Sequence, residues 1–244
     1  MKLWNFKNEI KQTFIEYHYA SINDPVYTTT QAYKHLERSP PPLEHTDQLA
    51  IPLRYEIMDA EPFEAVLKTR SSWPYPFPND QVIDMPFISK FSQLAFIGNG
   101  KVNRNYPSGG GQYYVKVHYL LNKVKVSKDL GDFSVYELDM DHQRLLAVGT
   151  NDWNEIQAAY IQKISVTTAQ FAIVLSVDLV NISKKYTDIS YKLVQQEAGH
   201  IGQNIQLVGN YMGIKTLPLG GFYDLPLSNI IGGNQTAIYT FLLG

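Results

Sequence analysis

The chain has 244 residues and 44% of them are hydrophobic, which is enough for a substantial core in one large domain, or in one domain with an appendage. Its 21 basic and 23 acidic residues give a net charge of −2, so charge provides no footprint for nucleic acid or an anionic membrane. Because the sequence has no cysteine, it excludes disulfides, a thiolate nucleophile and sulfur-ligated metal sites, and redox chemistry would need a bound cofactor.

Residues 1–59 are predicted to form an N-terminal appendage. A helical pattern covers residues 7–20, a polar stretch that ends in SPPP at 39–42 follows it, and a short strand or extended run is expected near residues 49–57. The N-terminus is amphipathic and charged, unlike the apolar core of a signal peptide, and the sequence has no apolar run long enough to cross a bilayer. We therefore expect a cytoplasmic protein that does not span a membrane.

Residues 60–244 combine helical and strand patterns without an internal repeat. Asp59 and Asp84 are expected to cap two helices, which end near residues 70 and 98 and are separated by the proline-rich loop WPYPFP. The other expected elements are strands at 113–121, 133–139 and 171–180, a helix at 151–162, a short helix near 225–231 and a strand at 237–243. This mixture predicts an α+β domain.

A long helix with one apolar face, within residues 184–224, is the most informative element. Its apolar residues recur at spacings of four and three, as expected for a stripe that faces the core: Val194, Ala198, Ile201, Ile205, Val208 and Met212. Gly199, Gly202 and Gly209 interrupt the helix, and each weakens it by about 1 kcal/mol relative to alanine. We therefore expect another backbone or a flat ligand to approach the helix closely.

Residues 104–112, RNYPSGGGQ, are predicted to form a glycine-rich loop. Successive glycines can expose backbone N–H groups to a phosphate, but the loop lacks the lysine and spacing of a P-loop and the G-x-G-x-x-G pattern of a dinucleotide fold. Taken alone, the loop fits turn chemistry as well as ligand binding.

Four motifs, in their order along the chain, resemble the azoline dehydrogenases of the nitroreductase superfamily, often called SagB-type: RNYPSGGGQYY, KKY, SYKLVQQEAGHIGQN and LGGFYD. These FMN-dependent enzymes oxidise thiazolines and oxazolines to thiazoles and oxazoles in ribosomally made peptides.

The resemblance covers residues 60–244 and implies a nitroreductase-like fold. Such a fold has an antiparallel-type central sheet flanked by helices, a long central helix, and an intertwined homodimer with FMN at its interface. Arg70 and Ser71 match the residues that open the flavin-phosphate site, where a guanidinium beside a hydroxyl suits a phosphate. Without the resemblance, Arg70 would be interpreted as a solvated cation at a helix end. The family has a second arginine where this chain has Trp73, and three cations are candidates to replace its charge: Lys68, Arg104 and Lys215.

The resemblance also implies that two segments border the flavin ring. Pro107, Ser108 and Gly109 belong to the loop on one side, and Gly220 and Gly221 to the turn on the other. Glycine suits both segments, because backbone N–H groups can approach the polar edge of the ring without side chains in between.

Gln203 and Asn204 match a Gln-Asn pair on the central helix of the family. We interpret them either as flavin contacts or as amides that bond to neighbouring backbone. Glu197 and His200 lie one turn apart on the same helix, but one such pair is too little for a metal site. No metal is therefore predicted, and His200 is expected to pack against the fold.

Lys185 and Tyr186 match the Lys-Tyr pair that azoline dehydrogenases use in catalysis. Azoline oxidation removes a proton from the α-carbon and delivers hydride from the β-carbon to the flavin, so a base opposite the ring is required. The resemblance assigns this role to Lys185 or Tyr186 and leaves open which of them takes the proton. Without it, a surface lysine beside an interface tyrosine would be the simpler interpretation. The family's Arg-Gly just after this pair is Ile189-Ser190 here.

We therefore predict an FMN-dependent azoline dehydrogenase that acts on a precursor peptide in a complex with a cyclodehydratase. Residues 1–59 would dock the partner enzyme or the peptide leader, or else wrap the second subunit. Two alternatives stay open: an NAD(P)H-dependent, nitroreductase-like oxidoreductase of small molecules, and a non-catalytic scaffold subunit of a peptide-modifying complex. The departures at Trp73 and Ile189-Ser190 favour the scaffold.

Overall fold

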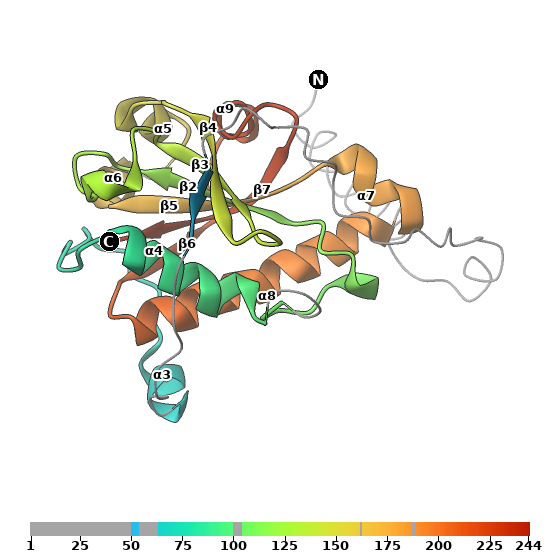
Figure 1. The fold of residues 1–244 in the computed structure, drawn as a ribbon, viewed down its shortest axis with the longest axis horizontal. Coiled ribbons are helices and arrows are strands. Elements are labelled where there is room, and N and C mark those ends of the chain that lie inside the picture. The colour runs from blue at the N-terminus through green and yellow to red at the C-terminus, as the bar shows by residue number, and fades with distance from the viewer. Residues whose placement is uncertain (1–49, 54–62, 100–103, 162, 187–188) are drawn as a thin grey trace, which may run out of the picture.

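A seven-stranded antiparallel sheet lies at the centre of the fold, between two layers of helices (Figure 1). The structure is a computed structural model that describes residues 50–53, 63–99, 104–161, 163–186 and 189–244. The strands are β1 (Ala50–Pro52), β2 (Lys116–Leu121), β3 (Val135–Asp139), β4 (Arg144–Gly149), β5 (Phe171–Val177), β6 (Thr216–Leu219) and β7 (Thr236–Leu243). They are arranged in the order β1-β4-β3-β2-β5-β7-β6, and each neighbouring pair is antiparallel. The predicted α+β fold with an antiparallel sheet is confirmed.

The sequence of β5 explains its position in the sheet. All residues of this strand, FAIVLSV, are buried. Phe171 pairs with Leu121 of β2 on one side and with Leu243 of β7 on the other. A strand that is apolar on both faces needs cover from both sides of the sheet, and the helices provide it.

Helices α4 and α8 cover one face of the sheet, and α5, α6 and α9 cover the other (Figure 1). Two hydrophobic cores result, one around Phe91 and Ile201 and the other around Ile156 and Leu227. Helix α3 projects away from the sheet below the C-terminal part of α8. The helices are α3 (Phe63–Thr69), α4 (Met85–Ser92), α5 (Trp153–Ala158), α6 (Lys163–Thr168), α7 (Leu179–Tyr186), α8 (Ser190–Tyr211) and α9 (Asp224–Ile230), with short turns η1 (Gln93–Ile97), η2 (Gly109–Gly111) and η3 (Lys128–Leu130).

Helix α4 begins as its sequence predicts. The Asp84 side chain accepts a hydrogen bond from the Phe87 backbone N–H at 2.8 Å, which satisfies one of the free donors of the first turn. After Ser92 the helix continues as the wider π-helical turn η1. This turn ends at Gly98, whose positive φ of 66° favours glycine. The cap at Asp59 lies outside the described residues.

The apolar stripe of α8 is confirmed. Val194, Ala198, Ile201 and Ile205 are buried in the core, and Val208 and Met212 are partly buried against it.

Two of the three glycines within α8 allow close packing of the protein itself. A Cβ atom at Gly202 would lie 2.7 Å from the Phe241 ring of β7, and one at Gly209 would overlap the methyl group of Thr216. A Cβ atom at Gly199 would meet nothing within 4 Å. The close approach that these glycines predict is therefore made at two positions by side chains of β7 and β6.

Among the described strands and α-helices, four were not predicted: β4, α6, α7 and β6. The strand expected to reach residue 180 ends at Val177, because Asp178 starts a helix. Its carboxylate accepts hydrogen bonds from the backbone N–H of Asn181 at 3.1 Å and from the Asn181 side chain at 2.6 Å. Lys185 and Tyr186 therefore lie on the last turn of helix α7.

The first described residues already belong to the sheet. Strand β1 pairs with β4 at the edge, with Ala50 opposite Leu146. The sheet thus includes residues on the N-terminal side of the boundary predicted at residue 59, whereas the helix expected at 7–20 lies outside the described residues. No helix in the described segments combines the length and apolar character needed to cross a membrane.

Candidate functional site

The glycine-rich loop lies along the N-terminal half of α8. Ser108 Oγ donates a hydrogen bond to Glu197 Oε2 at 2.5 Å and accepts one from the Tyr113 backbone N–H at 2.8 Å. A Cβ atom at Gly109 would lie 3.2 Å from the Leu193 side chain, so the loop backbone packs tightly on the helix. The loop predicted to border a ligand is thus anchored to α8 through Ser108.

Glu197 is the buried acid of this contact, with 2% of its surface exposed. Its Oε1 atom accepts a hydrogen bond from the Val115 backbone N–H at 3.2 Å. Burial raises the pKa of the carboxyl group to about 7, against the opposing effects of the Ser108 and Val115 hydrogen bonds and the positive charge of Arg104. From the sequence, Glu197 was weighed only as a metal ligand, although an acid beside the apolar stripe of a helix is a signal that its carboxyl group has a specific partner.

His200 differs from its expected role. It is exposed rather than packed, and its Nδ1 atom lies 3.5 Å from the Pro107 carbonyl oxygen. Among the residues that the structure describes, no three acidic or histidine side chains gather as a metal site would require.

The two amides on the central helix have different surroundings. Asn204 Nδ2 donates hydrogen bonds to the carbonyl oxygens of Ala95 at 3.0 Å and Asn105 at 2.7 Å, so this side chain joins α8 to η1 and to the start of the glycine-rich loop. Gln203 is exposed. Asn204 therefore has the backbone-bonded arrangement, while Gln203 leaves its amide accessible to a ligand.

Arg70 and Ser71 lie just after α3, next to the C-terminal half of α8. Arg70 Nη1 donates a hydrogen bond to Gln206 Oε1 at 2.6 Å, and Ser72 Oγ approaches the same oxygen at 3.4 Å. Ser71 is exposed. Gln206, which the sequence analysis did not single out, orients the guanidinium group.

The segment after Ser71 runs beside β6. Ser72 forms a parallel bridge with Thr216, and the Trp73 backbone N–H donates to the Thr216 carbonyl at 2.9 Å. This pairing brings Lys215 to Trp73, with the ammonium nitrogen 4.9 Å from the centre of the indole ring.

The other two candidate cations are engaged elsewhere. Arg104 forms an ion pair with Asp141 at 2.9 Å and lies over the Tyr113 ring. Lys68 lies 3.9 Å from Glu64, and both side chains are largely exposed. Of the three, Lys215 is the cation that lies beside position 73.

The turn at Gly220 and Gly221 follows β6 directly. A Cβ atom at Gly220 would meet nothing within 4 Å, so open space adjoins this backbone. The Gly221 carbonyl accepts a hydrogen bond from the Ile161 N–H at 3.0 Å, which fixes the turn on the segment between α5 and α6. Strand β6 thus runs from Lys215, the cation beside Trp73, to the accessible glycine turn at Gly220.

Helix α7 packs on α8 and carries Lys185 and Tyr186 in its last turn (Figure 1). Lys185 is half-buried, and Tyr186 is the final residue of the helix.

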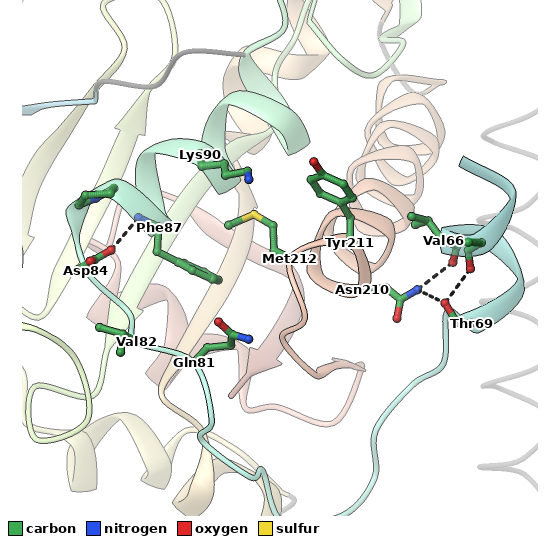
Figure 2. Close-up of a pocket in the computed structure, with 12 residues that line it drawn as sticks. Val66, Thr69, Gln81, Val82, Asp84, Phe87, Lys90, Asn210, Tyr211 and Met212 are labelled. Carbon is green, nitrogen blue, oxygen red and sulfur yellow. Dashed lines mark hydrogen bonds between the residues drawn. The ribbon is translucent and has the colours of Figure 1, made fainter. Parts of the chain in front are cut away.

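A cavity of about 700 Å³ lies elsewhere, between α3, α4 and the end of α8 (Figure 2). Phe87, Lys90 and Met212 are among its lining residues. Asn210 Nδ2 holds α3 at one side of it by donating to the Val66 carbonyl at 2.9 Å and to Thr69 Oγ1 at 2.7 Å. None of the predicted site residues lines this cavity, so it is distinct from the site assembled along α8 and β6.

Comparison with known proteins identifies the family. Residues 67–244 match the model of the nitroreductase family. A Methanocaldococcus jannaschii protein, provisionally named a nitroreductase, is 22% identical over 149 residues, which are 59% of this chain and 73% of that protein.

Two solved structures share the fold at low sequence identity. A chain of the E. coli microcin synthetase McbBCD complex with truncated pro-MccB17 bound has a TM-score of 0.65 at 19% identity, covering 97% of this chain and 91% of that one. An Anabaena variabilis protein, provisionally described as a nitroreductase, has a TM-score of 0.73 at 15% identity, covering 94% of this chain. This chain spans 46% of the length of the Anabaena protein.

Proposed function

Because the chain belongs to the nitroreductase family, we propose that it is an FMN-dependent dehydrogenase that oxidises thiazolines or oxazolines of a precursor peptide to azoles. Members of this family are oxidoreductases that bind FMN, and FMN is the cofactor of this chain. The peptide azoline as substrate goes beyond what family membership gives, and it is the specific part of this proposal.

The donor groups of the site suit FMN. Arg70 and Lys215 provide two cations near the hydroxyls of Ser71 and Ser72, a combination that suits a phosphate. At the other end of β6, the open space beside Gly220 leaves backbone accessible to a flat ring. Along α8, Gln206 and Glu197 are nine residues apart, roughly 14 Å at the rise of an α-helix, so the two ends suit an elongated ligand.

Bound FMN supplies the two-electron acceptor for oxidation. The chain must supply a base for the α-carbon proton, and we assign this role to Lys185 or Tyr186. Their place in the last turn of α7, which packs on α8, supports this assignment. Pro107, Ser108 and Gly109 would border the ring on the loop side, and Gln203 and Asn204 would lie on the helix beneath it.

One observation supports a peptide substrate above the others. The fold of this chain is similar to that of the microcin synthetase chain over nearly the full length of both proteins, and that structure contains a truncated pro-peptide. The ordered motifs RNYPSGGGQYY, KKY and LGGFYD support the same substrate class. A complex with a cyclodehydratase would supply the azoline, and cytoplasmic residence would match both partners.

We also propose a homodimer. Helix α3 has no buried residue, and it exposes 64% of Phe63 and 46% of Leu67. A helix that presents apolar side chains to solvent is stabilised when a second surface covers it. A second copy of this chain would provide that surface, and residues 1–59 would dock the partner enzyme or the peptide leader.

The experiment that tests the function combines colour and mass. The purified protein should be yellow, and in the reconstituted complex it should convert each azoline with a loss of about 2 Da, the two hydrogens of a two-electron oxidation. Lys185→Ala should retain flavin and lose this mass change, whereas Lys184→Ala serves as a matched control one residue away. Full activity of Lys185→Ala would contradict the role of this lysine.

Two other functions predict different results. Rapid bleaching of the flavin by NADPH, with reduction of small molecules, would favour a nitroreductase-like oxidoreductase, which the family name supports. A colourless protein that does not bind added FMN but copurifies with the cyclodehydratase would indicate a scaffold subunit.

A further inference from the structure

One buried carboxyl group holds the chain on both sides of the three glycines of the glycine-rich loop. Glu197 accepts from the Ser108 hydroxyl at 2.5 Å, just before these glycines, and from the Val115 N–H at 3.2 Å, just before β2 begins. The Ser108 oxygen in turn accepts from the Tyr113 N–H at 2.8 Å. Segment 107–115 is therefore closed on itself and fixed to α8 at two points by one carboxyl group, while the Pro107 carbonyl also lies 3.5 Å from His200 Nδ1 of α8.

The groups around Glu197 explain why it is the anchor. Arg104 contributes the opposing positive charge at the loop's N-terminal end, but its guanidinium group is paired with Asp141 at 2.9 Å. His200, one turn further along α8, is exposed and lies 3.5 Å from the Pro107 carbonyl. Because the nearby cation is already paired, the carboxylate depends on hydrogen bonds from the loop.

The loop cannot compensate by moving closer to the helix. Gly109 already packs on Leu193, where an added Cβ would lie 3.2 Å from the side chain. Loss of the anchor would therefore release the loop outward, away from α8.

We propose that Glu197 is a positioning residue that fixes segment 107–115 on α8 and thereby sets the backbone that borders the flavin. The second half of this inference rests on the proposed function, whereas the anchoring itself does not. Glu197 acts through Ser108 and Val115 rather than on the substrate.

The anchor depends on pH in a defined direction. Burial raises the pKa of Glu197 from 4.5 to about 7, so the closed loop binds a proton more tightly than an open loop in which water reaches the carboxyl group. Between pH 4.5 and about 7, a rise in pH favours the open loop, and the equilibrium constant for opening increases by up to about tenfold per pH unit. Above pH 7 this dependence levels off.

The test is hydrogen exchange of segment 107–115, measured by mass spectrometry at pH 5.5 and pH 8 and corrected for intrinsic rates. Glu197→Ala should raise exchange in this segment by about tenfold or more at both pH values, since it leaves the Ser108 hydroxyl and the Val115 N–H without their acceptor, while β5 stays protected. Glu197→Gln keeps an acceptor and cannot ionise, so it should match the wild type at pH 5.5 and exchange more slowly than the wild type at pH 8. Gln196→Ala, an exposed neighbour on α8, is the control and should behave as the wild type.

Ser108→Ala tests the same contact from the loop and keeps Glu197 in place, so it remains informative if Glu197→Ala fails to fold. It should raise the exchange of the Tyr113 N–H, which loses its acceptor. Unchanged exchange in Glu197→Ala or, if that variant does not fold, in Ser108→Ala would overturn the proposal. A pH trend in Glu197→Gln equal to that of the wild type would overturn its pH dependence.

FMN titration separates this inference from the proposed function. Glu197→Ala should weaken FMN binding about tenfold relative to Gln196→Ala, and comparing Glu197→Gln with the wild type at each pH cancels the titration of the FMN phosphate itself. A wild type that binds no FMN, with loop exchange as described, would refute the function and leave the anchor standing. A wild type that binds FMN, with loop exchange and affinity unaffected by Glu197→Ala, would refute the inference alone.

Discussion

The Arg70 guanidinium group donates a 2.6 Å hydrogen bond to Gln206 Oε1, across 136 positions of sequence. This contact joins the segment after α3 to the C-terminal half of α8. It holds a cation in place beside Ser72, whose hydroxyl approaches the same amide oxygen. A cation oriented in this way is preorganised to bind a phosphate, because its side chain loses less conformational freedom on binding than an unrestrained arginine would.

We expect Arg70→Ala to weaken FMN binding by roughly 10- to 100-fold, the range for losing a hydrogen bond between charged groups. Riboflavin, which lacks the phosphate, should bind the variant and the wild type equally. Gln206→Leu should cause a smaller loss for FMN, since the cation remains but is less well oriented. Fluorescence titration with both flavins measures this, with Gln196→Leu as the control, and an equal loss for riboflavin would contradict a phosphate role.

Lys215 should supply the charge of the arginine that Trp73 replaces. Its ammonium group lies 4.9 Å from the centre of the Trp73 ring. We expect Lys215→Ala to weaken FMN binding about tenfold and to leave riboflavin binding unchanged. Lys68→Ala is the matched control, because Lys68 pairs with Glu64 on the exposed surface of α3. If Lys68→Ala and Lys215→Ala have equal effects, the assignment of Lys215 is wrong.

Glu197 should make the free energy of unfolding depend on pH. The pKa of its carboxyl group is raised to about 7 in the folded chain, so the folded state binds the proton more tightly than the unfolded state. The contribution of this group to stability is therefore largest at low pH and decreases as pH rises from 4.5 to about 7, by roughly 3 kcal/mol in total.

Urea unfolding at pH 5 and pH 8 checks this sign. The stability of Glu197→Gln relative to the wild type should increase with pH over that interval, because the amide does not ionise. A difference between the two proteins that stays constant with pH would show that Glu197 has an ordinary pKa.

The three glycines of α8 provide an internally controlled series. Gly199→Ala should stabilise the fold by up to about 1 kcal/mol, because its Cβ meets open space and alanine favours the helix. Gly202→Ala and Gly209→Ala should destabilise it by about 1–3 kcal/mol, because their Cβ atoms would press on Phe241 and Thr216. Thermal unfolding of the three variants measures the series. Stabilisation by Gly202→Ala would contradict the packing described.

Local patterns allowed much of the fold to be predicted. The spacing of Val194, Ala198, Ile201 and Ile205 predicted the face of α8 that is buried, and Asp84 predicted the start of α4. The missed elements have weaker signals. Strand β6 contains Pro218, which is tolerated because β6 is at the sheet edge, and α7 begins with apolar residues that continue the apolar pattern of β5. Asp178, a cap residue, was the available signal for α7.

The family resemblance, the long amphipathic helix and the candidate residues could be recognised from the sequence alone, because motif order and the helical period are local properties of the chain. The sequence left open which cation lies beside Trp73 and indicated no partner for Glu197. The tertiary structure decided both: pairing of the Ser72 segment with β6 brings Lys215 to Trp73, and packing of the glycine-rich loop on α8 brings Ser108 to Glu197 across 89 positions of sequence. Such contacts depend on how distant elements pack together, and no local spacing encodes them.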